Sequence, residues 1–307
     1  MRVAIIDLGT NTFGLLIVDI KGSQYKTIHQ SREVVKLGQE NIIDNILSPD
    51  AFKRGVTALC NLSKIIQEYK AGTTKAFATS AIREASNAKD FIAEVKKQAN
   101  IEIEIISGDK EAELIYYGNK MAVNISEEPC LIMDIGGGSN EFIIANSTTV
   151  FWKQSFKLGV ARLLSMFKPE NPISEKTKQS IIDYLKTELQ PLLIELKKHP
   201  VITLIGSSGA FESVLHMIGK EDIIENKTSY DIDLEDYQAI SKKTIHSTAE
   251  ERLLMPGLIP MRRDMIVLSY ILIDFILNNT QIKKMTLSTY SLKEGAITLF
   301  MEKNQPI

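Results

Sequence analysis

The sequence predicts an α/β protein with two domains, and three observations support this. The chain has 307 residues, and a chain of this length usually divides into domains of about 100–200 residues. Predicted strands and helices alternate, which is typical of α/β folds with mixed sheets. A pattern of apolar strand, aspartate, glycine-containing turn and second apolar strand occurs twice, beginning with Asp7 and Asp134. We therefore predict one domain over residues 1–124 and a second over residues 125–307.

The first half opens with a predicted hairpin. Residues 3–9 and 13–20 are apolar runs joined by a polar turn, which indicates two strands. A helix is predicted over residues 48–69, with Ser48 or Asp50 as its cap. Further along we expect a strand at 75–81, a helix at 88–98, a strand at 101–107 and a helix at 110–120.

The second half repeats this order. Two strands are predicted on either side of the turn that follows Asp134. A long helix is expected over residues 174–198, with a possible kink at Pro191. The remaining expected elements are a strand, turn and helix over 201–215, helices at 234–243 and 263–277, a strand at 284–287 and a helix at 292–300.

Composition makes several classes of protein improbable. The formal net charge is −2, whereas nucleic-acid-binding proteins usually carry a basic excess. No apolar run reaches the roughly 18 residues that a membrane helix needs, and the N-terminus does not have the pattern of a signal peptide. Cys60 and Cys130 are expected to be free thiols in a reducing compartment. We therefore expect a cytoplasmic protein that binds neither nucleic acid nor membranes.

The two glycine-containing turns are the first candidate site. Glycine lets backbone N–H groups turn inward, and successive inward N–H groups form a concavity that binds anions. Acidic side chains beside such a turn suit Mg²⁺, which prefers carboxylate and phosphate oxygens. An ordinary hairpin turn is the alternative, but two matching turns favour phosphate and metal binding. The predicted phosphate-binding residues are Gly9, Thr10, Asn11, Thr12, Gly136, Gly137, Gly138 and Ser139, and the predicted metal ligands are Asp7, Asp134 and Glu141.

A third glycine-containing turn follows the strand near residue 205. Gly206, Ser207 and Ser208 lie between a predicted strand and a predicted helix, where backbone donors at the helix start favour anions. A simple connecting turn is an equally good interpretation of this motif alone. None of the three turns has the Walker A spacing, which argues against a P-loop protein.

These motifs together resemble the exopolyphosphatase / guanosine pentaphosphate phosphohydrolase (Ppx/GppA) family of the actin-like ATPase superfamily. The segments that carry the resemblance are DLGTNTF at residue 7, ATSAIREASN at 78, SGDKEAELIYYG at 107, DIGGGSNE at 134, LGVARL at 158, GSSG at 206 and PMRRD at 260. The resemblance implies two actin-like (ribonuclease H-like) domains with mixed five-stranded sheets, flanked by helices, and a cleft between the domains. A homodimer is also plausible on this basis.

The resemblance also implies roles for single residues. Glu111 matches the family's general base, which would activate the attacking water. Arg83 matches an arginine that contacts phosphate, for which a guanidinium is well suited; a surface ion pair with Glu84 or Asp90 is the alternative. Arg162 and Arg262 match two further family positions, although either could instead form an ion pair between the domains.

We therefore expect an exopolyphosphatase that uses Mg²⁺, or another hard divalent cation, to release orthophosphate from inorganic polyphosphate. Guanosine pentaphosphate is the alternative substrate, and a small-molecule kinase or a non-catalytic polyphosphate sensor are alternative functions. The chain departs from the family pattern at Gly14, where a large polar or basic residue is common, and at Lys293, where an arginine is common. Lysines at 176, 178, 186, 197–198 and 283–284 could guide a polyphosphate chain, but such runs are more often solvated helix faces.

Overall fold

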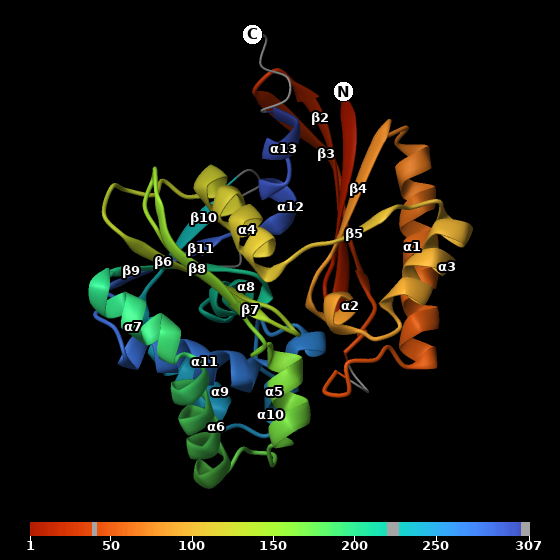
Figure 1. Cartoon of the computed structure of the whole chain (residues 1–307). Coiled ribbons are helices and arrows are strands. Elements are labelled where there is room, and N and C mark those ends of the chain that lie inside the picture. The colour runs from red at the N-terminus through yellow and green to blue at the C-terminus, as the bar shows by residue number, and fades with distance from the viewer. Residues whose placement is uncertain (39–41, 220–226, 302–307) are drawn as a thin grey trace.

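The computed structural model describes residues 1–38, 42–219 and 227–301. Two α/β halves, each built on one mixed sheet, lie side by side, and helices α4 (Gly108–Ala122) and α12 (Leu292–Gly295) lie between them (Figure 1). This arrangement confirms the α/β fold with two mixed sheets flanked by helices.

The first sheet has five strands in the order β3-β2-β1-β4-β5. Strands β1, β2 and β3 form an antiparallel meander, and β4 and β5 run parallel to β1. Helices α1 and α3 cover one face of this sheet (Figure 1). Ser48 caps α1 as predicted, because its hydroxyl accepts a hydrogen bond from the Ala51 N–H at 3.2 Å. The elements of this half are β1 (Arg2–Leu8), β2 (Thr12–Lys21), β3 (Gln24–Val34), α1 (Pro49–Glu68), β4 (Thr73–Ala78), α2 (Ser80–Glu84), α3 (Ala88–Ala99) and β5 (Ile103–Ile105).

The second sheet repeats this topology and adds one strand. Its order is β10-β11-β9-β6-β7-β8. Strands β6, β7 and β8 form the meander, β9 and β11 run parallel to β6, and β10 pairs antiparallel with β11 at the edge. The sheet therefore has six strands where five were expected. Its strands are β6 (Cys130–Ile135), β7 (Asn140–Ala145), β8 (Val150–Phe156), β9 (Thr203–Ser207), β10 (Ser229–Ile232) and β11 (Lys284–Ser288).

Most helices of the second half pack on one face of this sheet, whereas α12 and α13 lie on the other face beside α4 (Figure 1). Pro191 lies in the first turn of α7, where proline is favoured, so the helix predicted over 174–198 is two helices that meet at Leu189. The helices are α5 (Val160–Phe167), α6 (Glu175–Glu188), α7 (Gln190–Lys198), α8 (Gly209–Met217), α9 (Leu234–Ile245), α10 (Ala249–Leu253), η1 (Pro260–Arg262), α11 (Ile266–Asn278) and α13 (Thr298–Met301).

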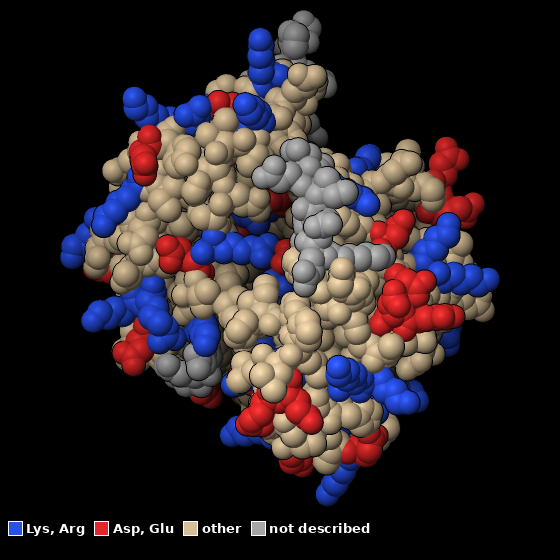
Figure 2. Space-filling model, turned by 180° about the vertical axis from the view of Figure 1, so that it is seen from behind, with Lys and Arg blue, Asp and Glu red and all other residues tan. Residues whose placement is uncertain are grey.

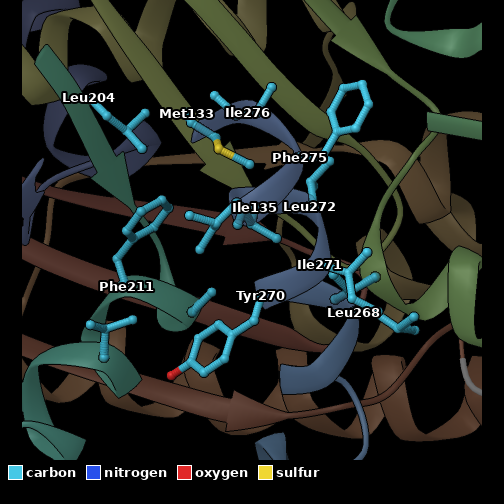
Figure 3. Packing of buried hydrophobic residues seen from close by; sticks show 14 of the residues in the cluster. Met133, Ile135, Leu204, Phe211, Leu268, Tyr270, Ile271, Leu272, Phe275 and Ile276 are labelled. Atoms are coloured by element: carbon cyan, nitrogen blue, oxygen red, sulfur yellow. The ribbon is translucent and has the colours of Figure 1, made fainter. Parts of the chain in front are cut away.

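Helix α11 is apolar almost all round and lies inside this half, as expected for a helix that is buried on every side. Figure 3 shows its side chains against those of β6, β9 and α8. The residues labelled there are Met133, Ile135, Leu204, Phe211, Leu268, Tyr270, Ile271, Leu272, Phe275 and Ile276.

A third apolar cluster joins the two halves. It combines Val3 and Ile5 of the first sheet with Ile132 and Ile143 of the second, through side chains of α4 and α12. Each Å² of apolar surface that is buried contributes about 25 cal/mol of stabilisation. The cluster therefore holds the halves together on the side of the molecule where α4 and α12 lie. The domain boundary after residue 124 stays a prediction.

Two smaller expectations can also be compared with the structure. Cys60 and Cys130 are both free. Within the described ranges, no helix is both long enough and apolar enough to cross a membrane.

Candidate active site

The two predicted turns have the same backbone arrangement. The N–H of Gly9 donates to the carbonyl of Thr12 at 3.1 Å, and the N–H of Gly136 donates to the carbonyl of Ser139 at 3.0 Å. In the strand register, Asp7 lies opposite Gly14 and Asp134 lies opposite Glu141. The two motifs are therefore structural equivalents, one in each half of the molecule.

Neighbouring segments fix both turns through their carbonyl groups. The Thr10 and Asn11 carbonyls accept hydrogen bonds from the chain after β3, and those of residues 136–138 accept from the start of α5 and the residue before it. The N–H groups of Thr10, Asn11, Gly137 and Gly138 donate to no acceptor in the described part of the chain. Buried N–H groups normally have a partner, so these four N–H groups are available to an anion.

The turns converge on one cavity of about 280 Å³ between the halves. A Cβ added to Gly137 would lie 2.7 Å from Nδ2 of Asn11, and one added to Gly138 would lie 2.6 Å from the hydroxyl oxygens of Thr10 and Ser80. The second turn can therefore approach the first this closely only because it consists of glycines. Figure 2 shows the molecule from behind, where a hollow opens between the halves and Lys or Arg side chains lie across and beside it.

Most of the predicted site residues line this cavity. They are Asp7, Gly9, Thr10, Asn11, Thr12, Glu111, Asp134, Gly136, Gly137, Gly138, Ser139, Glu141 and Ser208. Arg83, Gly206 and Ser207 are not among its lining residues.

Glu111 projects into the cavity from the first turn of α4. The helix begins at Gly108, with the hydroxyl of Ser107 accepting a hydrogen bond from the Lys110 N–H. Gly108 packs against Ser155 of β8, which brings the start of α4 beside the second sheet. The Glu111 side chain is buried. Burial raises its pKa to about 7 even though Arg83 opposes the shift, and a pKa near the working pH suits a general base.

Arg83 holds this carboxylate in place. Its Nη1 donates to Oε2 of Glu111 at 2.7 Å and to the carbonyl of Ile106 at 3.2 Å. Its Nε lies 3.6 Å from Glu84, so the ion pair considered as an alternative is present. A direct contact between Arg83 and phosphate stays a prediction.

Three more carboxylates share the cavity with Glu111. Burial raises the pKa of Asp7 to about 6, raises the pKa of Asp134 in spite of hydrogen bonds from Ser207 and Ser291, and raises the pKa of Glu141 well above its usual value. Mutual repulsion adds to these shifts, because Glu111 and Asp134 also raise the pKa of Glu141. A cation would relieve this excess of negative charge, although no three acidic, histidine or cysteine side chains in the described residues form a ready-made metal cluster.

The third predicted turn mainly positions other residues of the site. Strand β9 continues through Ser207, whose hydroxyl donates to Oδ2 of Asp134 at 2.6 Å. Gly206 gives room to the ring of Phe211. Of the three residues predicted to bind phosphate, only Ser208 lines the cavity, and its hydroxyl donates to the carbonyl of Ile135 at 2.9 Å. Phosphate contacts from Gly206 and Ser207 stay predictions.

An ion-pair network joins the halves at the cavity. Glu212 of α8 accepts hydrogen bonds from Arg32 of β3 at 3.1 Å and from Arg262 at 2.7 Å. Although burial alone would raise it, these two arginines bring the pKa of Glu212 to about 2. Only the Arg32–Glu212 pair crosses between the halves, because Arg262 and Glu212 both lie in the second half. Arg162 is buried, its Nε faces the Gly138 carbonyl at 3.4 Å, and its Nη2 has no hydrogen-bond partner in the described residues.

Among the other residues that line the cavity, four polar ones had no predicted role in the site. Arg32 lies on a polar edge strand, Ser291 donates to Oδ2 of Asp134, and Ser80 has a buried hydroxyl with no partner among described residues. The fourth, Lys293, was noted only as a departure from the family pattern. The only signal for Ser80 in the sequence is its place in the motif at residues 78–87, close to Arg83.

Comparisons with known proteins identify the family of the chain. The model of the Ppx/GppA phosphatase family matches residues 16–304. The chain belongs to this family. It is therefore a phosphoanhydride hydrolase with an actin-like fold, as the motifs predicted.

Solved structures support the same assignment. An exopolyphosphatase from Cytophaga hutchinsonii is 36% identical, with a TM-score of 0.95 and 99% of each chain covered. A Ppx/GppA family member from Aquifex aeolicus is 23% identical, with a TM-score of 0.83 over 100% of this chain and 99% of the other. The second likeness shows the fold alone.

Proposed function

We propose that this phosphatase is an exopolyphosphatase that releases orthophosphate from the end of inorganic polyphosphate. One observation carries the proposal: four N–H groups without protein acceptors, two from each half, lie on a cavity that also contains the buried carboxylate of Glu111. The N–H groups would bind the terminal phosphoryl group and stabilise its charge during transfer. Glu111 would take a proton from the attacking water.

The lining of the cavity favours polyphosphate over guanosine pentaphosphate. None of its lining residues within the described ranges is aromatic, whereas nucleobases are commonly bound by stacking on aromatic rings. A volume of about 280 Å³ suits the end of a phosphate chain better than a complete nucleotide. The similar Cytophaga hutchinsonii protein is described as an exopolyphosphatase, which supports the same substrate.

Asp7, Asp134 and Glu141 would hold the expected divalent cation. Asp134 and Glu141 are buried and Asp7 is half-buried, and the raised pKa values of all three suit a site that needs added positive charge. Because the described carboxylates form no closed cluster, Mg²⁺ would share its coordination with phosphate oxygens and water, as it does in many phosphoryl-transfer sites. When bound, the ion would polarise the phosphoryl oxygens.

The substitution Glu111→Gln tests the general-base assignment. It keeps the shape of the side chain and removes its ability to accept a proton, so kcat for orthophosphate release from polyphosphate should fall about 10²- to 10⁴-fold. Binding of tripolyphosphate, measured by calorimetry, should be retained.

Glu113→Gln is the matched control. Glu113 lies two residues further along α4, is partly exposed and pairs with Lys110 at 3.2 Å. This variant should keep near-normal turnover. Normal turnover by Glu111→Gln would remove Glu111 from the mechanism, and tight binding without turnover by the unmodified protein would instead support a sensor.

A further inference from the structure

Lys293 has an uncommon environment for a lysine. It lies on α12, lines the cavity between the halves, and is only 8% exposed. Its ammonium group forms no hydrogen bond and no salt bridge within 4 Å with any described residue, although its charge opposes the rise in the pKa of the nearby carboxyls of Asp7 and Asp134. Lysine is almost never buried without a partner, and a buried unpaired charge is costly.

The other basic residues of the cavity differ from Lys293. Arg32 and Arg262 are both paired with Glu212, and Lys36 is exposed. Lys293 is therefore the one buried cation that lines the cavity, among described residues, without a hydrogen bond or ion pair. Its interaction with Asp7 and Asp134 acts only through space, so the three N–H donors of its ammonium group are available to an anion that enters the cavity.

The position of Lys293 also shows which part of a substrate it can reach. Its side chain crosses Gly14, and a Cβ added there would lie 3.3 Å from Nζ. Gly14 lies opposite Asp7 in the hairpin, beside the first turn. Helix α12 packs directly on α4, where Gly118 faces the carbonyl of Ser291. Lys293 and Glu111 thus project into the cavity from one pair of packed helices.

We propose that Lys293 binds a non-bridging oxygen of the terminal phosphate, the group that is transferred. This proposal rests on the proposed function and names a further substrate-binding residue for it. An ammonium contributes a charge-assisted hydrogen bond, which complements the neutral N–H donors of the two turns. Gly14 is part of the same arrangement, because a side chain at that position would occupy the space that the lysine fills.

The test measures phosphate binding separately from turnover. In calorimetry, Lys293→Met should weaken binding of orthophosphate about 10- to 100-fold, because a hydrogen bond to a charged group is lost. The affinity for tripolyphosphate, measured in the Glu111→Gln background, should fall by a similar factor. Lys293→Arg should restore much of both affinities. Lys97→Met, at an exposed site on α3, should leave both affinities unchanged.

Three results would overturn the proposal. The first is an unchanged affinity of Lys293→Met for orthophosphate and tripolyphosphate. The second is a loss of thermal stability with normal affinity, since Lys293 would then be only a structural counter-ion. Weaker binding of tripolyphosphate alone would move the contact to a phosphate further along the chain. If Lys293→Met fails to fold, Lys293→Gln replaces it in the same assays. Orthophosphate release by the unmodified protein is measured first, because its absence would contradict the proposed function and not this inference.

Discussion

The two turns of the site share a backbone but differ in their side chains. At the tip, the first turn carries Thr10 and Asn11 where the second carries Gly137 and Gly138. The side chains of the first turn lie over the glycines of the second. The repeated motif therefore gives two complementary surfaces, and this difference is what lets both sets of N–H groups reach one cavity.

The aspartates before the turns differ as well. Asp134 accepts hydrogen bonds from the hydroxyls of Ser207 and Ser291, at 2.6 and 2.5 Å. Asp7 accepts no side-chain hydrogen bond from the described residues, and burial raises its pKa to about 6. The second aspartate is fixed by its neighbours, whereas the first is free to respond to a bound ion or phosphate.

Gly138→Ala should have the largest effect on this complementarity. The new Cβ would lie 2.6 Å from the hydroxyl oxygens of Thr10 and Ser80, so the turns would have to separate. Misplacement by about 1 Å can cost roughly 100-fold in rate. We expect kcat/KM for polyphosphate to fall about 100-fold, while the circular dichroism spectrum stays unchanged.

Gly72→Ala is the control for this change. Gly72 is exposed, and a Cβ there would meet nothing within 4 Å, so activity should be normal. Full activity in Gly138→Ala would mean that the turns need not approach so closely for turnover.

The sequence predicted the parts of the fold that depend on local pattern. The opening hairpin, the capped helix α1 and the repeated strand and turn are present because apolar periodicity and caps act over short distances. Strand β3 and strand β10 were not predicted. Residues Gln24–Val34 are mostly polar and partly exposed, so their strand forms by pairing with β2 and leaves little periodicity to detect.

The site was predictable to the extent that it lies within motifs. The two turns, Glu111 and the three acidic residues all line the cavity. The partners of these residues depend on contacts between distant segments: Arg83 pairs with Glu111, and Lys293 lies over Gly14. No spacing rule reports such pairs, because they form where α4 meets α2 and where α12 meets β2.

Removal of the hydroxyls that hold Asp134 should have a smaller effect than Gly138→Ala. Groups that orient metal-binding side chains typically account for 10- to 100-fold in metal affinity or activity. We therefore expect Ser207→Ala combined with Ser291→Ala to raise the Mg²⁺ concentration for half-maximal activity about 10-fold. A magnesium titration of orthophosphate release measures this.

Ser241→Ala provides the matched comparison. Ser241 makes an equivalent hydrogen bond to Asp274 at 2.8 Å, between α9 and α11, and neither residue lines the cavity. The Mg²⁺ concentration that Ser241→Ala needs for half-maximal activity should equal that of the unmodified protein. An unchanged requirement in the double variant would show that Asp134 does not need to be held in place for ion binding.

The smallest expected effect is on stability and follows from the raised pKa values. Burial raises the pKa of Asp7 from 3.8 to about 6 and that of Glu111 from 4.5 to about 7. Between about pH 4 and 7 the folded chain thus binds more protons than the unfolded chain, so stability falls as pH rises through this range. In EDTA, Tm should be lower at pH 8 than at pH 5, and Mg²⁺ should recover part of the loss at pH 8.

The two aspartates should contribute unequally to this dependence. Asp7→Asn removes a carboxylate that lacks hydroxyl partners, so it should raise Tm at pH 8 in EDTA by a few degrees, at about 2–4 °C per kcal/mol. Asp134→Asn should raise Tm less, because it also disturbs the bonds from Ser207 and Ser291. Equal effects of the two substitutions would mean that those hydroxyls do not distinguish the aspartates. A wild-type Tm that increased from pH 5 to pH 8 would mean that the cavity's carboxylates do not destabilise the folded chain when they ionise.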